Sequence, residues 1–97
     1  MQFEWDETKN AINSRTRGLS FATAALIFDG PVVEREDLRF PYGERRVVAI
    51  GKVDESCLTV IFTDRRIGDN VVRRIISARK SNRMERNQYG QAYPTNT

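Results

Sequence analysis

The chain has 97 residues, which suffices for one domain with one modest core. Its 39% hydrophobic and 30% charged residues, with a mean hydropathy of −0.57, are typical of a globular protein and exclude a membrane-spanning or disordered chain. The formal charge is +3, and the sequence has no histidine and one cysteine, which excludes histidine-based nucleophiles, a standard zinc site and an internal disulfide.

The N-terminal residues predict a short apolar segment followed by a capped helix. Phe3-Glu4-Trp5 alternates apolar and polar side chains, so it is either a short strand or a staple that packs against the helix. Asp6 is a good N-cap for a helix ending at Arg17, and Gly18 stands where a left-handed C-cap residue is expected. No secretory signal precedes this segment, so we expect a cytoplasmic protein.

A second helix and a sheet are predicted to follow. Ser20 can cap a helix over residues 21–28. Four segments rich in Val and Ile predict strands, and the turn pairs Asp54-Glu55 and Gly68-Asp69 separate the last three. The connections are too short for parallel crossovers, so we predict an antiparallel sheet of about four strands, formed by residues 32–36, 45–53, 56–63 and 70–77.

The C-terminal segment predicts a polar helix that Ser81 caps and that reaches about residue 89. Residues 92–97 have little to bury, so we expect a flexible tail after a single domain of residues 1–91. The fold class predicted is therefore α+β, with two N-terminal helices packed on the sheet and one helix at the C-terminus.

Charge is distributed unevenly along the chain. Residues 1–64 carry eight basic and eleven acidic side chains, whereas residues 65–97 carry eight basic and two acidic ones. Thirteen of the sixteen basic residues are arginines, whose planar guanidinium suits bidentate contact with phosphate. The pattern favours a polyanionic partner, and the alternative is a solvated surface with scattered ion pairs.

RNA cleavage without a metal is compatible with this composition, because the 2′-hydroxyl is an internal nucleophile and arginines can neutralise the charge on phosphorus. Without histidine, the candidate proton carriers are Lys80, Tyr89 and Glu44. The acidic residues Glu34, Glu36 and Asp37 are read as solvated charges of an edge strand, so no metal or other cofactor is expected.

Several short motifs, in this order, resemble the BrnT family. They span about residues 2–90, and the Ile-Ser-Ala-Arg segment with a tyrosine downstream is the most specific of them. The motifs are Phe3-Glu4-Trp5-Asp6-Glu7 with Lys9 and Asn13, Gly18-Leu19-Ser20-Phe21, Phe28-Asp29-Gly30-Pro31, Glu44-Arg45-Arg46 with Ile50-Gly51, and Arg74-Ile75-Ile76-Ser77-Ala78-Arg79-Lys80 with Glu85 and Tyr89.

The resemblance implies a ribonuclease toxin of a type II toxin–antitoxin pair with a RelE-like fold. Its expected partners are RNA and a BrnA-like DNA-binding antitoxin, which neutralises the toxin by direct contact and with it represses their operon. The complex is expected to be a hetero-oligomer built on an antitoxin dimer, to reach operator DNA only through the antitoxin, and to have no membrane role.

The expected catalytic residues are Arg79 and Arg83 at the phosphorane, with Lys80, Tyr89 or Glu44 moving protons. The expected RNA-binding residues are Arg17, Arg46, Arg65, Arg66, Arg74 and Arg86. Many relatives carry histidine where this chain has Arg17, which cannot act as a base at neutral pH. A module that binds RNA or a protein without catalysis is the alternative function.

Overall fold

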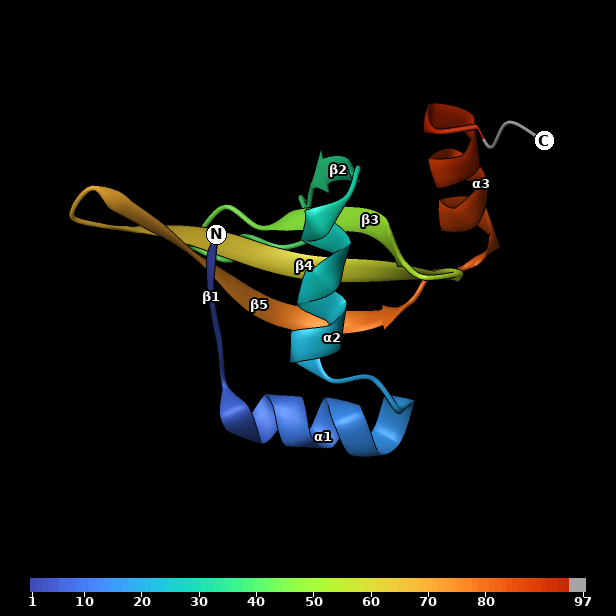
Figure 1. The fold of residues 1–97 in the computed structure, drawn as a ribbon. Coiled ribbons are helices and arrows are strands. Elements are labelled where there is room, and N and C mark those ends of the chain that lie inside the picture. The colour runs from blue at the N-terminus through green and yellow to red at the C-terminus, as the bar shows by residue number, and fades with distance from the viewer. Residues whose placement is uncertain (95–97) are drawn as a thin grey trace.

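The computed structural model describes residues 1–94, in which a five-stranded sheet carries helices on both sides (Figure 1). The strand order across the sheet is β1-β5-β4-β3-β2. The elements in chain order are β1 (Gln2–Trp5), α1 (Glu7–Arg17), α2 (Phe21–Ala25), the 3-10 helix η1 (Leu26–Asp29), β2 (Val33–Glu36), β3 (Val47–Val53), β4 (Ser56–Ile67), β5 (Asn70–Lys80) and α3 (Arg83–Ala92).

The first two helices begin and end where the local signals predicted. The Asp6 side chain accepts a hydrogen bond from the Lys9 amide at 3.0 Å, and Gly18 ends α1 in the left-handed conformation. Ser20 caps α2. The predicted single helix over 21–28 is instead an α-helix followed by η1, because the chain tightens into 3-10 geometry before Pro31.

The main core lies between the sheet and α2–η1, which cross one face of the sheet in Figure 1. Alternation along β4 directs Leu58, Val60 and Phe62 to this side, which we call the helical face. Gly51 of β3 is required there, because a Cβ atom at this position would lie 2.7 Å from the Cβ of Ile27.

The predicted antiparallel sheet of about four strands is corrected in two respects. The sheet has five strands, and β1 is parallel to β5, with Phe3 opposite Arg73 and Trp5 opposite Ile75. The antiparallel pairing predicted from the short connections is confirmed for β2 to β5. They do not constrain β1, because almost the whole chain separates it from β5 and supplies the crossover.

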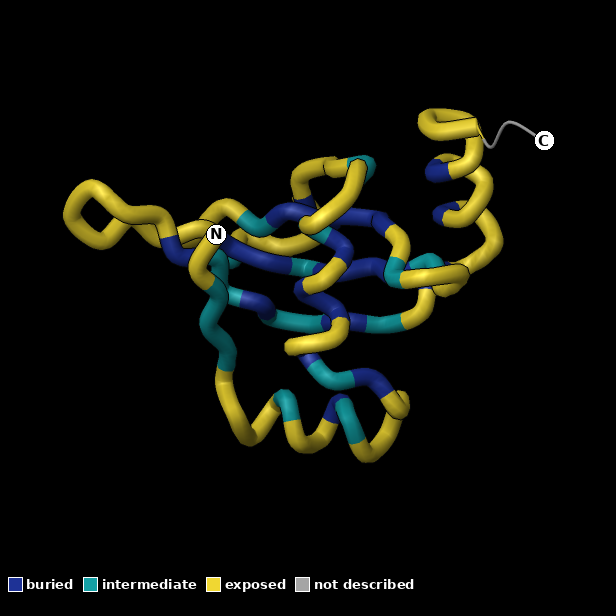
Figure 2. Tube along the Cα trace, viewed as in Figure 1, coloured by how far each residue is buried: buried dark blue, intermediate teal, exposed yellow. Residues whose placement is uncertain are grey.

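Strands β4 and β5 are longer than predicted and form a hairpin that projects beyond the rest of the sheet, where its tip is exposed (Figures 1 and 2). Its turn is at Gly68, which has a positive φ of 62°. Arg65 and Arg66 fall between the predicted strands 56–63 and 70–77, but both lie within β4 and therefore point to opposite faces.

Helix α3 begins one residue later than predicted and ends later. Asn82, not Ser81, is the N-cap, and it forms a capping box with Glu85. The Ser81 hydroxyl is buried and lies 2.7 Å from the Thr59 hydroxyl. The expected flexible tail, residues 92–97, begins with ordered residues: Ala92 ends α3, and the Tyr93 hydroxyl donates to the Val32 carbonyl at 2.8 Å. Residues 95–97 lie outside the described residues.

Candidate functional site

The face of the sheet opposite α2 and η1 gathers arginines from four segments, and we call it the arginine face. Strand registers define it: Thr59 is opposite Arg79, Ile61 is opposite Ser77, and Thr63 is opposite Arg74. All of these side chains therefore share one face. The arginines on this face are Arg35 in β2, Arg46 next to β3, Arg65 in β4, and Arg74 and Arg79 in β5.

Two of these arginines share one carboxylate. Arg65 donates to both oxygens of Glu4 at 2.7 and 2.9 Å, and the nearest guanidinium nitrogen of Arg74 is 3.6 Å from the same side chain. The hydrogen bond from Arg65 is the main cause that lowers the pKa of Glu4. One negative charge therefore faces two positive charges, and Arg74 keeps most of its capacity for a phosphate.

Arg46 is held over an aromatic ring at the start of β3. Its guanidinium carbon lies 3.9 Å from the centre of the Tyr42 ring, and its Nε donates to Glu44 at 3.1 Å. The Tyr42 hydroxyl in turn donates to Asp37, which is buried and also paired with Arg39. The loop before β3 thus fixes the position of Arg46 and places the Glu44 carboxylate beside it.

Arg79 is joined to the cap of α3. It donates to both oxygens of Glu85 at 2.6 and 2.9 Å, and the same carboxylate accepts from the Asn82 amide at 2.9 Å. Burial alone would raise the pKa of Glu85, but the hydrogen bonds from Arg79 and Asn82 outweigh it, so this pKa is lowered. Arg79 is thus positioned by a buried carboxylate, with which a phosphate on this face must compete.

Two predicted proton carriers point away from Arg79. Lys80 follows Arg79 in β5 and points to the helical face, beside Leu58. Tyr89 is buried, its hydroxyl donates to the Pro31 carbonyl at 3.1 Å, and burial raises its pKa. Arg83 is exposed in the first turn of α3. Neither Lys80 nor Tyr89 is therefore placed to move a proton at Arg79.

Other predicted RNA-binding residues make contacts that hold the fold. Arg17 donates to the Ala78 carbonyl at 2.9 Å, with the Ser77 hydroxyl at 3.5 Å, so it fastens the end of α1 to β5. Arg86 donates to the Ser81 carbonyl at 2.8 Å. Arg66 lies on the helical face, opposite in direction to Arg65.

Arg35 is a member of the arginine face that the sequence did not single out. It is opposite Val48 in β3, and it makes no ion pair among residues 1–94. The acidic neighbours Glu34 and Glu36 gave this strand the character of a solvated edge. The signal that could have identified Arg35 is the two-residue alternation, which separates it from both carboxylates.

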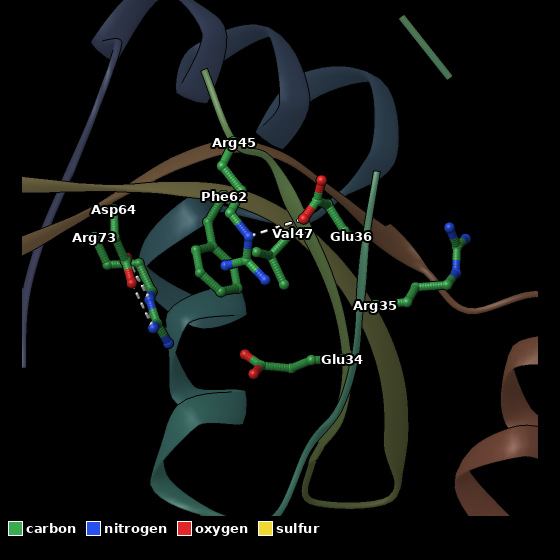
Figure 3. Close-up of a pocket in the computed structure, with 8 residues that line it drawn as sticks. All are labelled: Glu34, Arg35, Glu36, Arg45, Val47, Phe62, Asp64 and Arg73. Atoms are coloured by element: carbon green, nitrogen blue, oxygen red, sulfur yellow. Dashed lines mark hydrogen bonds and ion pairs between the residues drawn. The ribbon is translucent and has the colours of Figure 1, made fainter. Parts of the chain in front are cut away.

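A polar cleft of about 280 Å³ opens on the helical face between β2 and β4. Figure 3 shows Arg45 joined to Glu36, Arg73 joined to Asp64, and Glu34 directed into the space between them. Arg35 points away from this cleft. With three carboxylates and two guanidinium groups inside, the cleft does not favour a polyanion, unlike the arginine face.

Six of the thirteen carboxylate side chains form ion pairs with arginines. No three Asp, Glu or Cys side chains within residues 1–94 gather closely enough to hold a metal ion. The residues that instead form ion pairs with arginine are Glu4, Glu36, Asp37, Glu44, Asp64 and Glu85.

Comparison with known families decides which class of protein carries this face. Residues 5–85 match the family described as the ribonuclease toxin BrnT of type II toxin–antitoxin systems. The chain belongs to the BrnT family. BrnT proteins are the toxins of type II toxin–antitoxin systems, so an antitoxin is the partner that this membership implies. A search of curated proteins found no match. Within residues 1–94, no helix of this BrnT protein is both long enough and apolar enough to span a bilayer.

Proposed function

We propose that this BrnT protein is an endoribonuclease that inhibits translation in the cytoplasm by cleaving RNA on its arginine face. The observation that supports the proposal most directly is the gathering of Arg35, Arg46, Arg65, Arg74 and Arg79 on one side of the sheet. Such a surface matches the charge of an RNA backbone, and guanidinium groups suit both phosphate binding and stabilisation of a phosphorane.

In the proposed reaction, the 2′-oxygen attacks the adjacent phosphorus and the bond from phosphorus to the 5′-oxygen breaks. The products are a 2′,3′-cyclic phosphate and a 5′-hydroxyl, and no metal takes part. Arg46 and Arg74 hold phosphates, since they lie two strands apart, about 10 Å, on either side of Thr63. Arg79 neutralises charge at phosphorus. Glu44 stands with Arg46 beside Thr63, about 13 Å along β4 from the position opposite Arg79, and so does not reach this phosphorus. Water takes the 2′-hydroxyl proton and gives one to the departing 5′-oxygen.

We further propose that a DNA-binding antitoxin neutralises the protein by direct contact and carries it to operator DNA. A closed hetero-oligomer built on an antitoxin dimer fits the prevalence of twofold symmetry. Co-purification of the two proteins, followed by an operator gel shift with and without the toxin, tests this. A toxin that joins the DNA only when the antitoxin is present is expected, and a toxin that shifts the operator alone would contradict it.

The deciding experiment is incubation of the purified protein with a defined RNA in EDTA, with identification of the new ends. Cyclic phosphate and 5′-hydroxyl ends are expected. Cleavage that requires added magnesium would overturn the metal-independent mechanism. RNA binding that weakens with salt but gives no product under either condition would favour a non-catalytic module.

Single variants test whether the reaction takes place on the arginine face. Arg74→Ala is the cleanest test, because Glu4 keeps its bidentate pair with Arg65 and the fold loses little. Cleavage should fall by about tenfold or more in Arg74→Ala. Arg15→Ala is the matched control, since it removes the same charge from the exposed surface of α1. Equal losses in Arg74→Ala and Arg15→Ala would remove the arginine face from the mechanism.

A further inference from the structure

A groove of about 490 Å³ lies between α3 and the arginine face of β2 and β3. Its apolar lining consists of the half-buried Val33 and the exposed Ala92, with the buried Ile50 beneath them. Its polar lining consists of Arg35 and the side chains of Gln88 and Gln91 on α3, which are exposed. The size lies within the range of about 300–1,000 Å³ that is common for small-ligand sites.

The groove is continuous with the proposed cleavage surface. Ile50 is opposite Thr59, and Thr59 is opposite Arg79, so the backbones of Ile50 and Arg79 lie two strands apart, or about 10 Å. Glu85, which holds Arg79, stands three residues before Gln88, a rise of about 4.5 Å along α3. An RNA strand whose phosphate meets Arg79 therefore has a neighbouring nucleotide within reach of the groove.

The chemistry of the lining suits a nucleobase. Val33 on the sheet and Ala92 on α3 offer an apolar surface against which the flat face of an unstacked base can pack. A glutamine amide presents a donor and an acceptor side by side, the pattern that pairs with a base edge such as N6 and N7 of adenine. Arg35 has no ion pair among the described residues and can meet the phosphate of the same nucleotide.

We propose that this groove is the base-recognition subsite, in which Gln88 and Gln91 read the edge of one unpaired nucleobase next to the cleaved bond. The proposal rests on the proposed ribonuclease function and adds the residues that give it sequence preference. The cationic Arg35 and the adjoining arginines favour a nucleotide over an apolar or basic side chain of a protein partner.

The test compares the cleavage sites of three proteins on an RNA with a randomised segment. They are the wild type, the Gln88→Ala/Gln91→Ala variant, and Asn87→Ala as a matched control that removes an exposed amide from α3 outside the groove. The wild type and Asn87→Ala should prefer one base at one position near the cut. The double variant should lose that preference by about tenfold while still cleaving.

A second measurement does not depend on cleavage. Short RNA oligonucleotides with 2′-O-methyl groups, which cannot supply the nucleophile, are titrated into each protein. Base-dependent affinity in the wild type that is lost in the double variant supports the subsite, even if the proposed ribonuclease activity fails. Unchanged base preference in both assays would overturn the subsite and leave the ribonuclease proposal intact. Weakened antitoxin binding with unchanged base preference would overturn it in favour of a protein-docking groove.

Discussion

The Arg79 guanidinium serves the fold as well as the proposed chemistry, because its partner Glu85 is buried and caps α3. The sequence predicted for Arg79 only a place at the phosphorane. In the structure, Arg79→Ala would leave the Glu85 carboxylate buried without a counter-charge, which is one of the costlier changes in a protein. A loss of cleavage in that variant alone would therefore be ambiguous.

We predict that Arg79→Ala lowers the free energy of unfolding by about 3 kcal/mol, because it uncovers the buried Glu85 charge. Adding Glu85→Gln should restore about half of that loss, since the amide can still serve the cap without a charge. Cleavage should stay low in the double variant. Denaturant unfolding and RNA cleavage, measured on all three proteins, check this, and recovery of cleavage together with stability would show that Arg79 is structural only.

The lowered pKa of Glu85 makes the stability depend on pH. A carboxyl whose pKa is lowered on folding stabilises the protein above its usual value of 4.5 and loses that contribution as the pH falls through the folded value. Glu85→Gln should be about 2 kcal/mol less stable than the wild type at pH 7, and the gap should narrow below about pH 4. Urea unfolding at both pH values measures it, with the exposed Glu55→Gln as control. A gap that stays constant with pH would contradict the assignment.

At single positions, the directions of some side chains were predictable from the sequence and those of others were not. The alternation of β5 already separates Arg79 from Lys80, and that of β2 separates Arg35 from Glu34 and Glu36. Both inferences were within reach of the sequence. The direction of Tyr89 was not, because it depends on how α3 docks against the residues before β2.

At the scale of elements, the helix ends followed from local signals and the long-range pairing did not. Asp6, Gly18 and Ser20 act through neighbours in the chain, so their roles were readable from the sequence. The pairing of β1 with β5 joins segments about 70 residues apart. The arginine face was therefore only partly predictable, because the neighbourhood of Arg46 and Arg74 depends on strand registers that few local signals fix.

Arg17, the last residue of α1, binds the part of β5 that β1 does not cover. Strand β1 covers β5 only from Val72 to Ile75, and the Ala78 carbonyl beyond it receives its hydrogen bond from Arg17. We predict that Arg17→Ala lowers the free energy of unfolding by about 1–2 kcal/mol. Arg15→Ala, two residues away and exposed, should be nearly neutral. Denaturant unfolding compares them, and equal stabilities would show that the contact with β5 contributes nothing.

At the scale of the whole molecule, charge is sorted between the two sides of one sheet. The cleft on the helical face pairs its arginines with an excess of carboxylates. The arginine face carries five guanidinium groups against the carboxylates of Glu4, Glu44 and Glu85. The net charge of +3 hides this arrangement, and so does the division of the sequence at residue 64, because Arg35 and Arg46 come from the acidic part.

This sorting predicts how RNA affinity depends on salt. If Arg35, Arg46, Arg74 and Arg79 each meet one phosphate, the logarithm of the affinity should fall with the logarithm of salt concentration with a slope of about −3. Arg74→Ala should make the slope shallower by about 0.7, whereas Arg45→Ala on the helical face should leave it unchanged. Titration of a 2′-O-methyl RNA between 50 and 200 mM salt, roughly the range in which such slopes are measured, tests this. Equal changes in both variants would mean that the whole surface, and not one face, attracts the RNA.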